Sequence, residues 1–278
     1  MRGGFVMAIR DGDTVHLVRD GVGVRTLVWA QHEGRTVFAV ESKGITAVPG
    51  FPRRLRPAAI AQYLSFSFVP GAGTMLEGIE EMLPGHTLTL RPGHAPKLRR
   101  WFYFEHPEAS DELTEEEWVS RVADTTALAV AERMPSNRPF ATFLSGGLDS
   151  SLVLAELCSQ GVERPKTFSI HFGDRYDNEL EFAHLVAKRC GADHTDVLIE
   201  PRDFLPRMRR AIWHMDAPIG DPITIPNFEL ARQVGRDFSW VFNGEGGDPL
   251  FGGPKNITMM MHQWYGSGDR SPGARERQ

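Results

Sequence analysis

The residues best suited to hold a phosphate group lie together in one short polar stretch. They are Ser145, Gly146, Gly147, Asp149, Ser150 and Ser151. The small residues at the start of this stretch let a turn bring several backbone N–H groups together around an anion. A helix beginning near Leu148 would direct its positive end to the same place, and the aspartate offers a hard oxygen ligand suited to Mg²⁺. The sequence therefore predicts a phosphate-binding turn between a strand and a helix.

Glycine and serine are also common in ordinary turns, so a plain strand-to-helix connection is the alternative. The stretch differs from the P-loop pattern G-x-x-x-x-G-K-[ST], because it contains no lysine, and it differs from G-x-G-x-x-G. A second polar stretch, 243–253, carries the carboxylates Glu245 and Asp248 among five glycines. A flexible surface loop would explain this second stretch equally simply.

Alternating strands and helices surround both stretches. Short apolar runs, each followed by a helical pattern, are typical of an α/β fold with a parallel sheet covered on both faces. The predicted strands span 140–144, 167–172, 194–199 and 238–243, and the predicted helices span 149–158, 179–190, 204–214 and 228–234. Ligands in such sheets bind beyond the carboxyl ends of the strands, so we expect both polar stretches at one edge.

The N-terminal part of the chain has a different pattern. Residues 5–42 alternate and turn as a small antiparallel sheet would, which predicts a β-rich domain over 1–104. A polar, breaker-rich linker over 105–113 precedes a second domain over 114–265, whose first helix begins at a Thr-x-x-Glu capping box. The tail, 266–278, has no apolar residue to bury, and we expect it to be disordered.

Composition excludes several classes of protein. The net charge of −5 argues against a nucleic-acid-binding surface, and no apolar run approaches the ~20 residues of a membrane span. The N-terminus has no secretory hydrophobic region. Cys158 and Cys190 form neither a metal motif nor a disulfide framework, and both fall on predicted helices, where we expect buried free thiols. These features favour a cytoplasmic location without nucleic-acid or membrane partners.

The two polar stretches together carry a resemblance to a known family. Ser-Gly-Gly-Leu-Asp-Ser matches the pyrophosphate-binding loop of enzymes that split ATP into AMP and pyrophosphate, and Gly-Glu-Gly-Gly-Asp, with Phe-Gly-Gly following, is similar to a second motif of the same enzymes. Over roughly 5–262 the chain resembles the glutamine-hydrolysing asparagine synthetase family. The resemblance implies a PP-loop ATP pyrophosphatase domain preceded by part of an antiparallel, β-rich glutaminase-like domain.

The resemblance also implies a reaction. A substrate carboxylate, aspartate in the family, would attack the α-phosphorus of ATP, and pyrophosphate would leave as Mg²⁺ and the N–H groups stabilise its charge. An amine such as ammonia would then attack the acyl-adenylate. Asp149 and Asp248 would hold Mg²⁺, and Glu245 would act as the general base that accepts the proton of the amine.

Further residues complete the expected site. The resemblance places adenine-contacting backbone at Leu144 and Ile170, the ends of the first two strands of the second domain. Gly244 would let the backbone pass close to the nucleotide. Residues 216–221 could line the pocket for the acyl group, although their prolines alone would account for a rigid loop.

The sequence departs from the family pattern at both ends. The glutaminase nucleophile of the family is an N-terminal cysteine, whereas this sequence starts Met-Arg-Gly-Gly, so we expect no glutamine hydrolysis. A C-terminal helical extension with a lysine facing the α-phosphate has no match, which predicts a chain truncated at both ends and a possible glutaminase or C-terminal companion chain. The alternatives are amide closure of the β-lactam synthetase or peptide-cyclase type, and a non-catalytic ATP-binding subunit.

Overall fold

The computed structural model of the chain describes residues 3–104 and 113–251. Its contacts divide the chain into two compact units, the first made of residues 1–112 and 204–225, the second of 113–203 and 226–278. The segment 204–225 thus packs with the N-terminal residues, although the sequence analysis assigned it to the second domain. Most of the predicted linker and all of the predicted tail lie outside the described residues.

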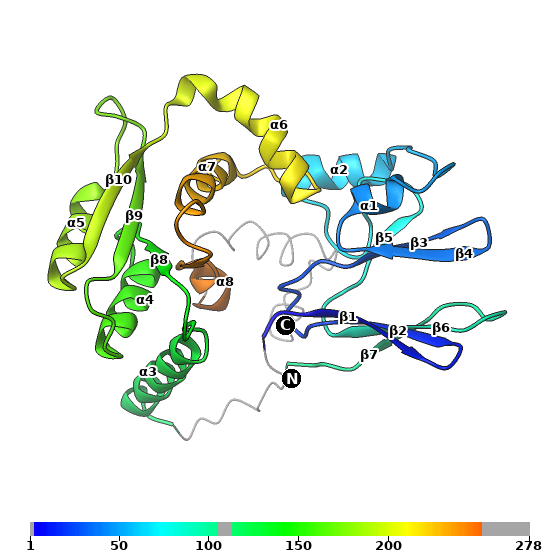
Figure 1. Ribbon diagram of the computed structural model, residues 1–278, viewed down its shortest axis with the longest axis horizontal. Coiled ribbons are helices and arrows are strands. Elements are labelled where there is room, and N and C mark those ends of the chain that lie inside the picture. Colours follow the sequence, from blue (N-terminus) through cyan, green and yellow to red (C-terminus); the bar gives the residue numbers. More distant parts are fainter. Residues whose placement is uncertain (1–2, 105–112, 252–278) are drawn as a thin grey trace, which may run out of the picture. The chain divides into compact units, whose positions relative to one another are not determined.

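The first unit is built on two antiparallel sheets, with strand orders β1-β2-β6-β7 and β4-β3-β5 (Figure 1). Its elements are β1 (Val6–Asp11), β2 (Thr14–Arg19), β3 (Val28–His32), β4 (Arg35–Ala39), α1 (Ser42–Thr46), α2 (Pro57–Phe66), β5 (Ile79–Glu81), β6 (His86–Leu90), β7 (Lys97–Arg100) and α6 (Phe204–Met215). Strands β1 and β2 form a hairpin whose turn needs the positive φ of Gly12, +57°. The predicted antiparallel sheet is confirmed.

The first unit also buries a charged residue, Asp20, which directly follows β2. Asp20 is fully buried, and its carboxylate accepts hydrogen bonds from the backbone N–H groups of Phe5, Val22, Val24 and Arg25 at 3.0–3.3 Å. Burial raises the pKa of this carboxyl, but hydrogen bonds from the backbone, led by that of Val24, outweigh it and hold the pKa below its ordinary value. The cluster fixes the 20–25 loop through a charge whose oxygens are well paired.

The second unit contains a four-stranded parallel sheet with the order β10-β9-β8-β11. Its elements are α3 (Glu115–Ala131), β8 (Phe140–Phe143), α4 (Leu148–Ser159), β9 (Lys166–His171), α5 (Leu180–Arg189), β10 (Asp193–Leu198), the 3₁₀ turn Pro201–Asp203, α7 (Thr224–Val234), β11 (Trp240–Phe242) and α8 (Gly247–Phe251). Helix α3 begins at the predicted capping box, in which Thr114 and Glu117 bond each other's backbone N–H groups. The predicted α/β fold with a parallel sheet is confirmed.

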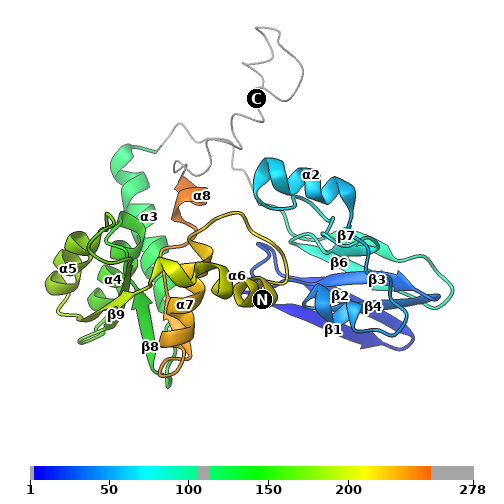
Figure 2. The same ribbon diagram turned by 90° about the horizontal axis from the view of Figure 1, so that it is seen from above.

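Helices cover both faces of this sheet, as is usual for a parallel sheet (Figures 1 and 2). On one face, Ala141 and Val197 pack against Leu230 of α7. On the other face, Leu144 packs against Leu154 of α4 and Ala183 of α5. Because side chains alternate along a strand, the same alternation sends a set of buried hydroxyls toward α4 and α5, including Thr142, Thr167 and Ser169.

Several short elements were absent from the sequence-based prediction. Helix α1, strand β5 and helix α8 each have three to five residues, too few to show a period. Strand β7 ends at Arg100, because the N–H groups of Trp101 and Phe102 turn to the carbonyl oxygen of Gly85 at 2.8 and 3.3 Å. Among the residues that the structure describes, no helix is long and apolar enough to cross a membrane.

Candidate active site

The predicted phosphate-binding turn connects β8 to α4 at the carboxyl edge of the parallel sheet. The Ser150 hydroxyl, which is buried, accepts a hydrogen bond from the backbone N–H of Ser145 at 3.2 Å and lies 3.0 Å from the Ser145 hydroxyl. The Ser145 hydroxyl in turn accepts from the N–H of Gly147 at 3.2 Å. In this structure, therefore, both serine hydroxyls contact the loop itself and hold its shape.

Position 146 can be occupied only by glycine. Its φ of +87° lies in the left-handed region, and a Cβ at this position would come within 2.6 Å of the backbone nitrogen of Ala183 and 2.7 Å of Phe182 Cβ. Helix α5 thus packs directly on the turn, and neither the conformation nor the space admits a side chain. This close approach gives the turn a rigid support.

Leu144 leads into the turn while remaining tied to β9. Its N–H donates to the carbonyl oxygen of Phe168 at 2.9 Å, and its own carbonyl oxygen accepts from the buried hydroxyl of Ser169. Ile170, the other residue expected near adenine, lies one position before the end of β9 and packs in the core with α7. Ser169, which the sequence analysis did not single out, thus holds the start of the loop.

The second polar stretch connects β11 to α8 at the same edge, because β11 runs parallel to β8 and pairs with it. The side chain of Asn243 accepts a hydrogen bond from the N–H of Glu245 at 3.3 Å, and Gly246 has a φ of +107°. Glu245 is exposed, and Asp248 lies in the first turn of α8. Over its described residues, 243–251, the stretch forms a turn that leads into a short helix.

The two polar stretches meet at Asp149. A Cβ on Gly244 would lie 2.5 Å from the backbone nitrogen of Ser150 and 2.9 Å from Asp149 Cβ. A Cβ on Gly247 would overlap the carboxylate of Asp149. Both glycines therefore permit a backbone-to-side-chain contact that any larger residue would prevent, and Asp248 directly follows the second of them. The phosphate-type turn and the acidic turn form one continuous surface.

Two buried hydroxyls near this surface are unsatisfied. Ser151 Oγ in α4 and Thr142 Oγ1 in β8 are inaccessible to solvent and have no hydrogen-bond partner within the described part of the chain. Buried hydroxyls are nearly always paired, so each of these two can still accept or donate a bond. Ser151 was expected as a donor, whereas Thr142 was missed because it looked like an ordinary strand residue.

Comparison with known proteins identifies the family. The profile of the family described as Asparagine synthase matches residues 121–271, more than half of the 278-residue chain. The chain belongs to the asparagine synthase family. A second profile, described as Glutamine amidotransferase domain, matches residues 1–102.

Relatives of this asparagine synthase family member cover most of its length. Asparagine synthetase [glutamine-hydrolyzing] 1 of Bacillus subtilis is 28% identical over 91% of the chain. A putative asparagine synthetase [glutamine-hydrolyzing] of Mycobacterium tuberculosis is 30% identical over 91% of the chain, and Amidase chyE of Penicillium rubens is 29% identical over 91%. The chain spans 40% of the length of each of these three relatives.

One segment expected near the acyl group has another role in this family member. The carboxylate of Asp216 accepts hydrogen bonds from the N–H groups of Ser42 and Lys43, the first residues of α1, and lies 3.6 Å from Lys43 Nζ. Gly220 N–H donates to the carbonyl oxygen of Ser67 at 2.7 Å. Asp216 therefore caps the start of a helix of the first unit, and the expectation that residues 216–221 line a pocket stays a prediction.

The two cysteines are free and half-buried rather than fully buried. The thiol of Cys158 in α4 donates to the carbonyl oxygen of Cys190, which follows α5, at a sulfur–oxygen distance of 3.7 Å. Burial raises the pKa of Cys158 to about 11. A thiol with such a pKa is almost entirely protonated at neutral pH, so Cys158 is a poor nucleophile.

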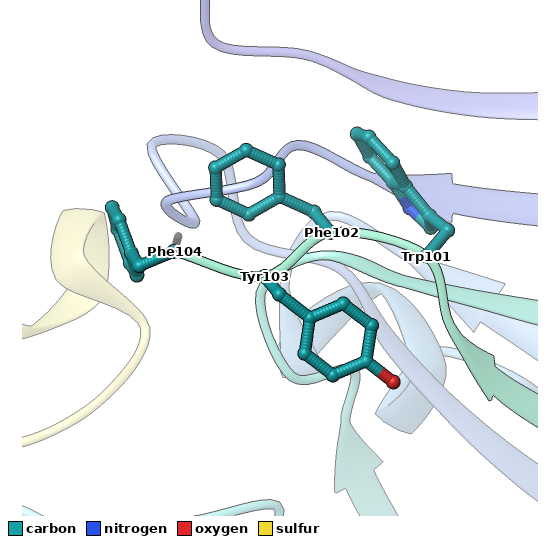
Figure 3. A pocket seen from close by; sticks show the side chains of 4 residues that line it. All are labelled: Trp101, Phe102, Tyr103 and Phe104. Atoms are coloured by element: carbon teal, nitrogen blue, oxygen red, sulfur yellow. The ribbon is translucent and has the colours of Figure 1, made fainter. Parts of the chain in front are cut away.

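The first unit contains a hollow of a different character. It has a volume of about 510 Å³ and is lined by Trp101, Phe102, Tyr103 and Phe104, which succeed one another after β7 (Figure 3). Neighbouring rings contact edge to face, with centroids 5.8 Å apart for Trp101–Phe102 and 5.3 Å apart for Phe102–Phe104. The four side chains include no carboxylate, imidazole or amine, so this hollow offers no acid–base pair and no metal ligand comparable with those of the Asp149 surface.

Proposed function

We propose that the chain is an ATP-dependent amide-forming ligase that works through an acyl-adenylate. The observation that carries the proposal is the contact of Gly244 and Gly247 with Asp149, because it joins the two motifs that the chemistry needs. A phosphate-binding turn alone would suit any nucleotide-binding protein. A general base and two metal-binding carboxylates at the same surface suit bond formation.

The reaction would proceed in two balanced steps. An oxygen of the substrate carboxylate, aspartate in our proposal, attacks the α-phosphorus of ATP, and the bond to the bridging oxygen breaks so that pyrophosphate leaves. An amine then attacks the acyl carbon, AMP leaves with the electron pair of the acyl–oxygen bond, and the excess proton of the amine passes to Glu245. The exposed position of Glu245 lets it reach a bound amine.

The side chains at the surface fit Mg²⁺. Asp149 and Asp248 are hard oxygen donors on adjacent turns, and Mg²⁺ is commonly bound by one or two carboxylates together with substrate phosphates. The bound ion would neutralise charge on the departing pyrophosphate. To contact the same phosphates, the N–H groups of Ser145 and Gly147 would exchange their bonds to the serine hydroxyls, and the buried hydroxyl of Ser151 would turn outward.

The nitrogen source follows from the position of the cysteines. Cys158 and Cys190 both lie in the second unit, away from the residues that match the amidotransferase profile. We therefore propose that the 278-residue chain assayed alone uses free ammonia, and that glutamine serves only when a glutaminase chain is supplied. The proposed partners are thus a small carboxylate and, in the cell, a companion chain that delivers ammonia or completes the nucleotide site.

The experiment that tests the proposal is exchange of labelled pyrophosphate into ATP, with Mg²⁺ and with or without aspartate. We expect aspartate-dependent exchange, and a fall of about 100-fold or more in Asp149→Ala, since removal of a group that stabilises the leaving charge typically has this effect. Glu245→Ala should retain most of the exchange and lose amide formation from ammonium. Glu163→Ala, on the loop before β9, serves as the matched control.

Three other outcomes would change the conclusion. ATP binding that depends on Asp149 but supports no exchange would favour the non-catalytic ATP-binding subunit. Exchange that requires a carboxylate other than aspartate would favour intramolecular amide closure or another acceptor, a possibility consistent with the name of the Penicillium relative, Amidase chyE. Loss of ATP binding in every form of the protein would contradict the proposed site itself.

A further inference from the structure

A compact group of metal-binding side chains lies on the edge strand of the parallel sheet, outside the two nucleotide turns. His184 projects from α5, and His194 and Asp196 project from the same face of β10. Nε2 of His184 is 2.9 Å from each oxygen of the Asp196 carboxylate, and Nε2 of His194 is 3.1 Å from Asp196 Oδ1. The three potential ligand atoms all lie within 4.8 Å of one another.

His194 is the most informative member of the group. Its side chain is only 10% exposed, and its Nδ1 is 2.8 Å from the hydroxyl of Thr167, a fully buried residue of β9. Its Nε2 is buried and, apart from the 3.1 Å approach to Asp196 Oδ1, has no hydrogen-bond partner among the described residues. A buried ring nitrogen that faces two other potential ligands without a regular hydrogen bond is uncommon in a folded protein.

The contact with Thr167 is compatible with the form of the ring that binds a metal. With a proton on Nδ1 donated to the threonine hydroxyl, Nε2 presents its lone pair toward His184 and Asp196. Metal-ligating histidines are commonly oriented in this way by a hydrogen bond from the other ring nitrogen.

We propose that His184, His194 and Asp196 form a binding site for a divalent transition-metal ion of the Zn²⁺ type. A tetrahedral ion with bonds of about 2.0–2.2 Å holds neighbouring ligand atoms about 3.3 Å apart, close to the spacing of 2.9 and 3.1 Å in this group. Two imidazoles and a carboxylate suit Zn²⁺, Co²⁺ or Ni²⁺, whereas Mg²⁺ prefers oxygen ligands. The three protein ligands leave a fourth position for water.

The site would have a structural effect on the second unit. It joins α5 to β10, which is the outer strand of the sheet and pairs only with β9 among the described strands. Helix α5 also supports the phosphate-binding turn through its contact with Gly146. A metal that binds only the folded protein raises its stability in proportion to the logarithm of the metal concentration, so occupancy would be seen as a rise in melting temperature.

The test is titration of the metal-free 278-residue chain with Co²⁺ in the presence of excess Mg²⁺, followed by visible absorption and then by displacement with Zn²⁺. We expect one Co²⁺ per chain with a tetrahedral-type spectrum, at least tenfold weaker binding in His184→Ala and in Asp196→Asn, and a Zn²⁺-induced rise in melting temperature that these variants lose. His184 has a half-exposed side chain, so its removal should leave the fold intact.

The controls separate this site from others. His94→Ala, an exposed histidine of the first unit, and Asp149→Ala should both retain the Co²⁺ spectrum. Displacement of Co²⁺ by millimolar Mg²⁺, equal binding in His184→Ala and the unmodified chain, or the absence of a stoichiometric spectrum would each overturn the proposal. Because the readout involves no ATP, failure of the proposed ligase activity would leave this result unaffected.

Discussion

The two units differ in how completely their buried polar groups are paired. In the first unit, the carboxylate of Asp20 accepts bonds from four backbone N–H groups, and the neighbouring Arg19 contacts Glu81 and three carbonyl oxygens. In the second unit, buried atoms of Thr142, Ser151 and His194 make no regular hydrogen bond with the described residues. Paired polar groups fix a structure, whereas unpaired ones retain the capacity to bind a ligand.

This difference between the two units predicts that substitutions in the first unit mainly change stability, whereas substitutions in the second mainly change activity. A buried charge that loses its partners is expensive, so the Asp20 cluster should govern the folding of the first unit. The unpaired groups of the second unit carry a cost that the folded chain tolerates, as is usual at sites that bind something else. Substitutions in the two regions should therefore be distinguishable by measuring stability and activity in the same variants.

The largest effect is expected from Asp20→Ala. Removal of the buried carboxylate leaves four backbone N–H groups without their acceptor, and we expect a loss of about 3 kcal/mol in the free energy of unfolding. Urea unfolding followed by circular dichroism measures this loss. Asp13→Ala, in the exposed hairpin turn of the same unit, is the matched control and should change stability by less than about 0.5 kcal/mol. An equal change in both variants would contradict the comparison.

A smaller effect, on activity rather than stability, is expected from Gly247→Ala. The added methyl group would overlap the Asp149 carboxylate, and we expect at least about a tenfold loss of pyrophosphate exchange because the metal ligand is displaced. Gly246→Ala is the control, since its new Cβ would meet nothing within 4 Å although its φ of +107° adds strain. If Gly246→Ala impaired exchange more than Gly247→Ala, contact with Asp149 would not be the cause.

The pH dependence of stability should reveal the contribution of the Asp20 carboxylate. The pKa of Asp20 is lower in the folded chain than its ordinary value, so its contribution is present in full above about pH 4 and is lost as the pH falls through the folded pKa. We expect Asp20→Asn to be less stable than the unmodified chain at pH 7 and to lose less stability on acidification. Urea unfolding at pH 7, 5 and 3 would reveal a constant difference if the prediction were wrong.

The smallest effect is expected at Asp216. Replacement by Asn removes the charge that faces Lys43 and weakens the cap on α1, for which we expect a loss of about 1 kcal/mol in the free energy of unfolding. Pyrophosphate exchange should be unchanged, because this carboxylate contacts a helix start of the first unit. A loss of exchange at constant stability would instead support the expectation that residues 216–221 line the acyl pocket.

The sequence predicted much of the second unit because its signals are local. The parallel strands alternate with helices at regular spacing, and Thr114 with Glu117 marks the start of α3 within four residues. Both polar turns were found from residue type and spacing alone. The predictions failed where an element was too short to show a period, as in α1 and α8.

By itself, the sequence determined which residues could do chemistry and which type of element would carry each of them. Only the tertiary structure decided which of them meet: Gly247 with Asp149, Asp216 with α1, and His184 with His194 and Asp196. The physical reason is that residue type and local period are properties of neighbours along the chain. Contacts between distant residues depend on strand order and helix docking, which the whole core fixes together.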